Sequence, residues 1–492
     1  MTSHARIYVI GAGFAGRGIA RELSAKGVMG RVVAFLDDDP AKIGEKIDHI
    51  PVLGPIDDVV RLLEKTPADE ALIAIPGASR ERLRRLYTTL RRANFERIRI
   101  LPSVSQILSD EAHFIQTRQI DPQDLLGRTP VNINLREALS YLRGRRVLIT
   151  GAGGSIGSEL ARQLLSGGAE RLYLLGHGEN SIYQIDTELR LLQEEGVGEQ
   201  AQIVPIVGEL TNREYLRFLI PRLRADVIFH TAAYKHVPMM ESNPVAAMEN
   251  NVFGTLNLLD IAADTGVGRF VLVSTDKAVS PRSTYGVSKR LAEELVLRTG
   301  TDGSGLATMV VRFGNVLGSR GSIMPIFRRQ IEKGGPVTIT DPAASRFFMT
   351  IPEAVSLVLT AGGVGRSGEL YVLDMGEPIN IREFAEQMIR FYGYEPDREI
   401  PIRTIGLRPG EKLRESLFDR DERPADSPSE RISRVERSPL EAALLERILR
   451  DLRPICFFDQ NRPAEYRNRR KLRMILSEVF PQLMQNPDEP EY

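Results

Sequence analysis

The sequence predicts an α/β protein with two Rossmann-like, doubly wound parallel-sheet domains, the second followed by a small C-terminal lobe. Two segments, 6–24 and 145–165, share one local pattern: an apolar strand, a glycine-rich turn and an amphipathic helix. Each is followed by further apolar runs that alternate with helical patterns. Strands that alternate with helices are typical of parallel sheets covered by helices on both faces. The repeated pattern therefore predicts two domains of the same fold class.

The apolar runs have the length of strands, and each stands before a helical pattern. The expected strands are 31–40 and 69–76 in the first domain, and 171–176, 202–210, 226–233, 269–276 and 308–318 in the second. After about residue 320 this rhythm loosens, and Gly and Pro turns separate short elements. We expect a substrate-binding lobe there.

These patterns divide the chain into four segments. They are an N-terminal nucleotide-binding domain (1–105), a connector (106–143), a second α/β domain with its lobe at about 320–420 (144–420), and a charged, partly helical tail (421–492). The connector is polar and contains prolines without a clear period, which predicts an ordered crossing segment. The basic run 467–473 predicts a solvated helix face.

Composition excludes several classes of protein. Of the 492 residues, 42% are hydrophobic and 26% charged, and the 65 basic and 65 acidic side chains cancel. This balance gives no general reason to expect nucleic acid or an acidic membrane as partner. A single cysteine, Cys456, fits a reducing cytoplasm, and no apolar run is long enough for a membrane span. The six His residues show no ligand spacing, so we expect no metal site.

The second glycine-rich turn predicts a dinucleotide site. Gly151, Gly154 and Gly157 follow a strand and open a helix, so that the backbone can approach a pyrophosphate at the helix N-terminus. The next strand ends at Gly176, where an Asp would select NAD, and His177 follows. The sequence therefore leaves NAD and NADP open. The other residues expected at the cofactor are Ser155, Ile156, Glu209, Leu210, Ala232, Ala233, Lys235 and Asn251.

The first glycine-rich turn has the same form. Gly11, Gly13 and Gly16 follow a strand, and Asp37 ends the next strand at about the usual spacing of ~20 residues. No Tyr-x-x-x-Lys pair stands in this domain. The turn predicts either a second nucleotide site, regulatory or structural, or a scaffold that has lost its ligand.

Tyr285 and Lys289 predict a catalytic pair in the second domain. They are four residues apart at a helix start and so share one face. The Lys289 ammonium would lower the pKa of the Tyr285 phenol from its usual ~10. Such a phenol can take a hydroxyl proton while hydride leaves the same carbon. Lys289 would also hold the nicotinamide ribose.

Thr275, Asp276 and Lys277 lie just upstream, at the carboxyl end of a strand. Ligands bind at this edge of open α/β sheets. If Tyr285 oxidises a sugar C4 hydroxyl, the C5 proton becomes acidic, and loss of water across C5 and C6 needs one base and one acid. Lys277 would be the base, with a pKa depressed by burial beside Lys289, and Asp276 the acid, with a raised pKa; the two roles could be exchanged.

Longer motifs extend over about residues 1–420. They are DLLGRTPV (124–131), TGAGGSIGSEL (150–160), AAYKHVPMME (232–241), ENNVFGT (249–255), STDKAV (274–279), RFGNVLGSRGSIMPIF (312–327), DPAASRFFMTIPEA (341–354) and RPGEKLRE (408–415). In these motifs the chain resembles bacterial UDP-N-acetylglucosamine 4,6-dehydratases, in the large polysaccharide-biosynthesis branch of the extended short-chain dehydrogenase/reductase superfamily. Large members usually carry N-terminal transmembrane helices, and many have Met where this chain has Tyr285.

The resemblance implies an NAD- or NADP-dependent hydro-lyase that makes a UDP-4-keto-6-deoxy-N-acetylhexosamine for capsule, lipopolysaccharide or glycan biosynthesis. It also implies a homodimer or larger homo-oligomer. The residues that it assigns to the UDP-sugar are Lys235, His236, Asn315, Ser322, Arg346, Arg408 and Glu411. The configuration at C5 stays open.

Two alternatives share much of this pattern. A UDP-N-acetylhexosamine 4-epimerase would use the glycine turn and the Tyr–Lys pair, but it would not need Asp276 and Lys277. A non-catalytic nucleotide-sugar sensor would need none of these side chains.

Overall fold

The computed structural model describes residues 5–26, 30–75, 78–95, 97–100, 118–119, 139–303, 305–427 and 429–483. The chain divides into two compact units, which we call unit 1 (Met1–Asn132 with Phe391–Gly393) and unit 2 (Ile133–Arg390 with Tyr394–Tyr492). Most of the expected connector (106–143) lies outside the described residues.

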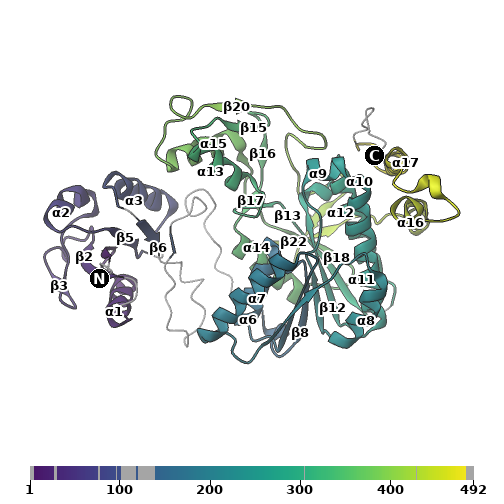
Figure 1. Cartoon of the computed structure of the whole chain (residues 1–492), viewed down its shortest axis with the longest axis horizontal. Coiled ribbons are helices and arrows are strands. Elements are labelled where there is room, and N and C mark those ends of the chain that lie inside the picture. The colour runs from purple at the N-terminus through teal and green to yellow at the C-terminus, as the bar shows by residue number, and fades with distance from the viewer. Residues whose placement is uncertain are drawn as a thin grey trace. The chain divides into compact units, whose positions relative to one another are not determined.

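Unit 1 is a five-stranded sheet in the order β2-β1-β5-β6-β7; Figure 1 labels β2, β5 and β6 of this sheet. The strands are β1 (Arg6–Ile10), β2 (Arg31–Leu36), β5 (Glu70–Ile73), β6 (Arg97–Ile100) and β7 (Arg118–Gln119), and β3 (Lys46–Ile47) pairs with β4 (Ile50–Pro51) outside the sheet. The first four are parallel and β7 is antiparallel. Helix α1 (Phe14–Lys26) packs on one face, and α2 (Val59–Lys65) and α3 (Arg80–Arg92) pack on the other.

Unit 2 is built on a nine-stranded sheet in the order β10-β9-β8-β11-β12-β13-β18-β22-β21. Its strands are β8 (Arg146–Thr150), β9 (Arg171–Gly176), β10 (Gln202–Val207), β11 (Val227–His230), β12 (Arg269–Thr275), β13 (Ala307–Phe313), β18 (Glu369–Leu373), β21 (Arg423–Ala425) and β22 (Ile432–Glu436). The first seven in sheet order are parallel, and their buried apolar runs are typical of a sheet covered on both faces. The α/β fold with parallel sheets is confirmed.

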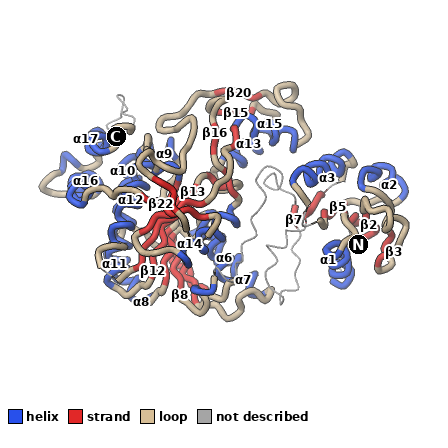
Figure 2. The backbone as a smooth tube through the Cα atoms, turned by 180° about the vertical axis from the view of Figure 1, so that it is seen from behind, coloured by secondary structure: helices blue, strands red, loops and turns tan. Residues whose placement is uncertain are grey.

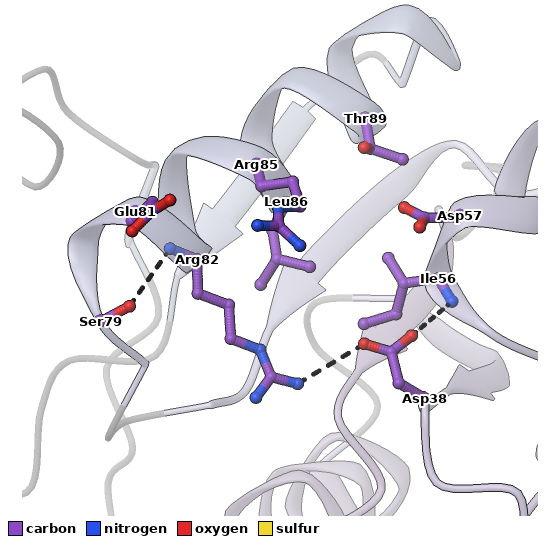
Figure 3. Close-up of a pocket in the computed structure, with 9 residues that line it drawn as sticks. All are labelled: Asp38, Ile56, Asp57, Ser79, Glu81, Arg82, Arg85, Leu86 and Thr89. Atoms are coloured by element: carbon purple, nitrogen blue, oxygen red, sulfur yellow. Dashed lines mark hydrogen bonds and ion pairs between the residues drawn. The ribbon is translucent and has the colours of Figure 1, made fainter.

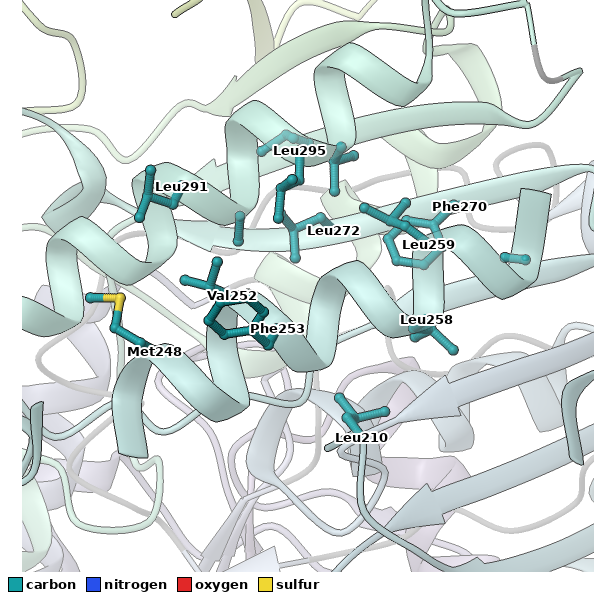
Figure 4. Close-up of a cluster of buried hydrophobic side chains, with 14 of the residues drawn as sticks. Leu210, Met248, Val252, Phe253, Leu258, Leu259, Phe270, Leu272, Leu291 and Leu295 are labelled. Atoms are coloured by element: carbon teal, nitrogen blue, oxygen red, sulfur yellow. The ribbon is translucent and has the colours of Figure 1, made fainter. Parts of the chain in front are cut away.

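Two hydrophobic cores cover the two faces of this sheet. One face carries α6 (Ser155–Ser166), α7 (Glu179–Glu194) and α14 (Ile351–Val364). The other carries α8 (Arg213–Leu223), α11 (Gly254–Asp264), α12 (Thr284–Thr299), α16 (Ala442–Cys456) and α17 (Arg469–Val479). Figure 4 shows part of this second core, where Leu291 and Leu295 of α12 lie near Leu272 of β12. The strand order reverses direction at β8, and ligands of such folds bind at the carboxyl ends of the strands beside that point.

Short elements lie between β13 and β21, where the sequence predicts the lobe, and Figure 2 labels several of them. They are β14 (Asn315–Val316), α13 (Ile323–Glu332), β15 (Val337–Ile339), β16 (Ser345–Arg346), β17 (Phe348–Met349), β19 (Ile379–Asn380), α15 (Ile381–Phe391) and β20 (Ile402–Thr404). They pair as three two-stranded sheets, β14 with β17, β15 with β20 and β16 with β19.

The segment expected as a charged tail (421–492) belongs to unit 2 instead. Strands β21 and β22 extend the main sheet, and α16 and α17 contribute Leu445, Leu452 and Leu472 to its core. The expectation failed because the sequence of this segment has no strand–helix rhythm, whereas its apolar stripes face a core built by other parts of the chain.

Candidate active site

The predicted catalytic side chains come together where β12 ends and α12 begins. Thr275 is the last residue of β12, Asp276 and Lys277 open the short helix η5 (Asp276–Ala278), and Tyr285 and Lys289 lie in the first turns of α12. Asp276 is fully buried, and Thr275, Tyr285 and Lys289 are each less than 10% exposed. An acid, two amines and a phenol therefore share one end of the sheet.

The start of α12 is shaped by its own sequence. The Ser283 hydroxyl accepts a hydrogen bond from the Gly286 N–H at 3.0 Å and so caps the helix. A Cβ on Gly286 would lie 2.4 Å from the Lys277 carbonyl oxygen. Glycine at this position lets the first turn of α12 approach η5, which brings Tyr285 to the Asp276–Lys277 pair.

Lys277 is surrounded by oxygen atoms from three segments. Its Nζ donates to Asp276 Oδ1 and to Asn315 Oδ1, each at 3.0 Å, and lies 3.6 Å from Glu415 Oε1. The Thr275 hydroxyl also donates to Asp276 Oδ1, at 3.0 Å. Asp276 Oδ2 is buried and has no hydrogen-bond partner among the described residues.

The charges around Lys277 overturn one expectation from the sequence. Burial alone would lower the pKa of Lys277, but the Asp276 and Glu415 carboxylates outweigh it and raise that pKa. Lys277 is therefore held as an ammonium, not depressed toward a free amine. The pKa of Asp276 is raised by burial, despite the opposing effect of Lys277, which is the expected direction.

The environment of Tyr285 also differs from the expectation. Burial raises the pKa of Tyr285 to about 12, although the Lys277 ammonium and a hydrogen bond with Thr275 act in the other direction. The nearby cation is thus Lys277 and not Lys289. The Lys289 ammonium donates to the Val273 carbonyl oxygen at 2.9 Å, and burial lowers its pKa to about 8. In this state the phenol is neutral.

The second glycine loop fits a dinucleotide. Gly151 has a positive φ of 68°, and a Cβ there would lie 2.7 Å from the Ala232 backbone. A Cβ on Gly157 would lie 2.3 Å from the Gly151 carbonyl oxygen. Helix α6 starts behind Gly154 without a side-chain cap, so the N–H groups of Ser155 and its neighbours can bind phosphate.

The other expected cofactor residues fall into two groups. His177 and Glu209 are exposed at the ends of β9 and β10, as contacts to an adenosine would require. Ile156 lies in the first turn of α6, whereas Leu210 follows β10 and Ala232 and Ala233 follow β11 in loops. Asn251, by contrast, is buried, and its amide donates to the Tyr234 carbonyl oxygen and the Ser288 hydroxyl, each at 2.9 Å. We therefore regard Asn251 as a support for the turn after β11, not as a cofactor ligand.

Arg320 is a further residue at the glycine loop that the sequence did not single out. Its Nη1 donates to the Gly153 carbonyl oxygen at 3.1 Å, and its N–H donates to the Ser155 hydroxyl at 3.1 Å. The next residue, Gly321, approaches His236 so closely that a Cβ would lie 2.6 Å from the ring. The turn at Arg320 and Gly321 thus connects the glycine loop with His236.

Of the residues assigned to the sugar nucleotide, Lys235, His236 and Arg408 are exposed in loops, and Glu411 is partly buried. Burial and the Lys277 ammonium lower the pKa of Lys235, and burial, Lys235 and Arg408 lower the pKa of His236. Arg408 is half exposed, and its Nη2 donates to Glu411 Oε1 at 2.6 Å. These electrostatic effects place Lys235, His236 and Arg408 within reach of one another.

Two other assignments change, and that of Ser322 stays a prediction. Asn315 was expected near UDP, but its side chain accepts a hydrogen bond from Lys277. Arg346 was expected at the diphosphate, but its guanidinium donates to the carbonyl oxygens of Lys412 and Leu413, at 2.7 and 3.0 Å. The Ser322 hydroxyl is buried without a hydrogen-bond partner among the described residues, which suits a polar ligand.

The basic run 467–473 does not form a solvated face throughout. Arg469 and Arg473 are less than 10% exposed. Arg473 Nη1 donates to Glu241 Oε2 at 2.9 Å, and Glu241 Oε1 accepts a hydrogen bond from the N–H of Thr284, the first residue of α12, at 2.6 Å. Helix α17 is thereby connected to the first turn of the catalytic helix.

The first glycine loop, in unit 1, is partly satisfied by its own protein. Gly11 has a positive φ of 101°, and a Cβ on Gly16 would lie 1.9 Å from the Gly11 carbonyl oxygen, so the turn is as tight as expected. Gly13 precedes α1. The Asp37 carboxylate accepts a hydrogen bond from the Ala12 N–H at 2.7 Å. The Asp37 carboxylate therefore binds the backbone of the loop, and this oxygen is not available to a ribose hydroxyl.

A cavity of about 330 Å³ lies elsewhere in unit 1 (Figure 3). It is lined by Asp38, Ile56, Asp57, Ser79, Glu81, Arg82, Arg85, Leu86 and Thr89. Arg82 reaches across it to Asp38, at 3.5 Å. Three carboxyl groups and two guanidinium groups face the cavity, so its charge favours no single class of ligand, and none of the loop glycines lines it.

The doubly wound sheet, the glycine loop and the Tyr–Lys pair define an extended short-chain dehydrogenase/reductase. The chain belongs to the polysaccharide biosynthesis protein family, whose sequence model matches residues 147–437. A model described as a CoA-binding domain matches residues 3–102. None of the described helices is both long and apolar enough for a membrane span.

Relatives of the chain include enzymes and polysaccharide proteins. It is 41% identical to the probable polysaccharide biosynthesis protein EpsC of Bacillus subtilis, over 85% of this chain and 69% of that protein. It is 32% identical to a UDP-glucose 4-epimerase of Rickettsia typhi, over 56% of this chain and 79% of that enzyme. Among solved structures, Pen from Bacillus thuringiensis superposes with a TM-score of 0.55 at 32% identity, covering 61% of this chain and 91% of that one.

Proposed function

We propose that this chain is a nucleotide-sugar 4,6-dehydratase that converts UDP-N-acetylglucosamine to a UDP-4-keto-6-deoxy-N-acetylhexosamine. One observation carries the proposal: an ion pair of 3.0 Å between the buried Asp276 and the partly buried Lys277 stands beside Tyr285. Oxidation and reduction at one carbon need only the Tyr–Lys pair. Elimination of water needs a second acid and a second base, and this pair supplies both.

The chain's own residues would act in three places. A nicotinamide dinucleotide held at Gly151, Gly154 and Gly157 would supply the hydride chemistry. Tyr285 takes the proton of the C4 hydroxyl, which requires its pKa to fall from about 12 once a positive charge lies near it. Lys289 would bind the ribose and contribute to that charge.

The Asp276–Lys277 pair then moves two protons. One member takes the C5 proton, and the other gives a proton to the C6 hydroxyl, which leaves as water, so the pair ends with the number of protons with which it began. Because Lys277 starts as an ammonium, it donates directly if Asp276 is the base. If Lys277 is the base, its proton must first cross the 3.0 Å contact to Asp276.

The experiment is proton NMR of the purified protein with UDP-N-acetylglucosamine and added NAD or NADP in heavy water. We expect a new methyl signal at C6 with deuterium at C5. The matched variant Lys277→Met is expected to lose methyl formation by about 10²–10⁴-fold. Bound cofactor should still be reduced in this variant, although more slowly, because C4 oxidation needs no proton from Lys277 but loses the cation that favours the Tyr285 phenolate.

A 4-epimerase is the second candidate, and the similarity to a UDP-glucose 4-epimerase favours it. It would give the anomeric signal of the C4 epimer with C5 still protonated, and Lys277→Met would slow turnover no more than it slows reduction of the bound cofactor. That pair of results would reject the dehydratase proposal.

A further inference from the structure

Glu415 is a buried carboxylate that faces the catalytic lysine from a distant part of the chain. Its side chain is 3% exposed, and its Oε1 lies 3.6 Å from Lys277 Nζ. Its other oxygen, Oε2, lies 3.6 Å from Lys412 Nζ. Because a buried carboxylate is costly without a cation, this residue has a reason to stand between two ammonium groups.

The segment that carries Glu415 is held in place by the lobe. Arg346 donates hydrogen bonds to the carbonyl oxygens of Lys412 and Leu413, and its Nε lies 4.0 Å from Glu415 Oε1. The Lys412 ammonium donates to the Val279 carbonyl oxygen at 2.6 Å, just beyond η5. Arg346 of the lobe and the hydrogen bond from Lys412 to Val279 therefore both fix the position of the segment that carries the Glu415 carboxylate.

Asp276 and Glu415 play different parts beside Lys277. Burial would raise the pKa of Glu415, but Lys277, Lys412 and Arg346 outweigh it and lower that pKa. The pKa of Asp276 is raised. Glu415 thus carries the lasting negative charge, whereas Asp276 can change its protonation.

The charged and titratable groups that act on Lys277 come from several elements. They are Asp276 on η5, Glu415 on the lobe segment, Tyr285 on α12, Lys235 after β11 and Lys412 beside Glu415. Of these, Glu415 is the only one that the proposed reaction does not use directly and that also favours the ammonium.

We propose that Glu415 is a positioning residue for the reaction, whose negative charge keeps Lys277 in place and in its ammonium form beside Asp276. The inference rests on the proposed dehydration. In the elimination step the C5–H bond breaks with its proton passing to one member of the Asp276–Lys277 pair, and the C6–O bond breaks with water taking a proton from the other. Glu415 exchanges no proton in this step.

The first test reads the protonation of Lys277 without using activity. The protein would be labelled with trace acetic anhydride from pH 7 to 12, and labelling of Lys277 would be followed by peptide mass spectrometry. Glu415→Gln should move the titration of Lys277 to lower pH by on the order of one unit, because a nearby negative charge is lost. Lys412→Met should move it to higher pH, because a competing cation is lost and Glu415 is left to Lys277.

The second test uses the pH profile of deuterium incorporation at C5. The part of the profile that depends on Lys277 should shift to lower pH in Glu415→Gln and to higher pH in Lys412→Met. Glu415→Asp should leave that part of the profile as in the wild type, because the substitution keeps the negative charge. Glu377→Gln, an exposed carboxylate of unit 2, is the control and should change neither titration nor profile.

An unchanged titration of Lys277 in Glu415→Gln would overturn the inference. If that variant does not fold, as judged by thermal unfolding, Lys412→Met becomes the deciding variant. A titration of Lys277 that does not move to higher pH in Lys412→Met would then overturn the inference. A wild-type protein that shows the expected titration but makes no 4-keto-6-deoxy product would reject the proposed function and leave the electrostatic role of Glu415 in place.

Discussion

The two glycine loops of this chain share a sequence pattern but rest on different supports. In unit 1 the Asp37 carboxylate binds the Ala12 N–H at 2.7 Å. In unit 2 the loop follows Thr150, whose hydroxyl lies 2.7 Å from Nδ1 of the buried His230. His230 Nε2 in turn lies 2.8 Å from the Thr255 hydroxyl.

The difference shows that glycines define the shape of the turn but not its chemistry. Both loops need a positive φ, at Gly11 and at Gly151. Only the second loop has an acid–base cluster, at Asp276 and Lys277, on the same sheet. The side chains near a glycine loop therefore determine which chemistry can take place there.

The largest expected effect contrasts the two glycines directly. In Gly151→Ala the new Cβ would meet the Ala232 backbone at 2.7 Å, and we expect dehydration to fall by about 100-fold or more, because a shift of about 1 Å in the loop misplaces the cofactor. In Gly11→Ala the nearest atom belongs to the flexible side chain of Ile75. In turnover assays the loss of rate should be at least tenfold smaller in Gly11→Ala than in Gly151→Ala. Equal losses in the two variants would contradict the expected difference between the loops.

A second prediction concerns the support of the catalytic helix. Arg473→Met leaves the buried Glu241 carboxylate without its cation, which we expect to lower the free energy of unfolding of unit 2 by about 3–5 kcal/mol. Lower turnover should accompany this loss because Thr284 and Tyr285 lose a fixed partner. Denaturant unfolding and turnover would be compared with Arg470→Met, an exposed neighbour in the same basic run that should be nearly neutral.

A third prediction concerns the dependence of stability on pH that comes from His230, the residue that supports the glycine loop of unit 2. Burial, and to a lesser degree Lys289, lowers the pKa of His230 from 6.5 to about 3. The unfolded chain binds this proton below pH 6.5 and the folded chain does not, so stability falls as pH drops from 6.5 toward 3. At pH 5 the loss should be about 2 kcal/mol, and urea unfolding at pH 7 and pH 5 should show it in the wild type and not in His230→Gln.

The smallest expected effect lies in unit 1. Hydrogen bonds from the N–H groups of Asp39 and Ala12, together with Lys42, outweigh burial and lower the pKa of Asp37. Its contribution to stability is therefore present above its ordinary pKa and is lost as pH falls through the lowered value. Asp37→Asn should cost unit 1 about 1 kcal/mol at pH 7 in hydrogen-exchange measurements on β1 and β2. No change there would show that the Asp37 contact does not support the loop.

Much of the fold was predictable because its signals are local. Apolar runs, glycine turns and helix periods each lie within a few residues, and they located β8, β9 and β12 closely. The short strands β21 and β22 carry no such pattern, so their place in the sheet depends on the pairing of β22 with β18 and of β21 with β22, which the sequence does not display.

The site was predictable in its members but not in its electrostatics. Tyr285, Lys289 and the Asp276–Lys277 pair stand in one stretch of sequence, so their proximity could be inferred. Glu415 approaches Lys277 only because the lobe folds back onto the sheet, and Asp276 together with this second carboxylate reverses the expected direction of the Lys277 pKa. The motif RPGEKLRE contained Glu415, but spacing alone could not show which of its charged residues is buried.

The contact between Arg473 and Glu241 also has a consequence for the order in which the enzyme is completed. Tyr285 leaves the ribosome well before Arg473, since synthesis runs from the N-terminus and domains tend to fold as they emerge. A nascent chain can therefore assemble most of the nine-stranded sheet while Glu241 and the first turn of α12 still lack their buried cation. Translation of α17 is then the event that completes the support of α12, and a message cut short before it would yield a protein with every proposed catalytic side chain but without this support.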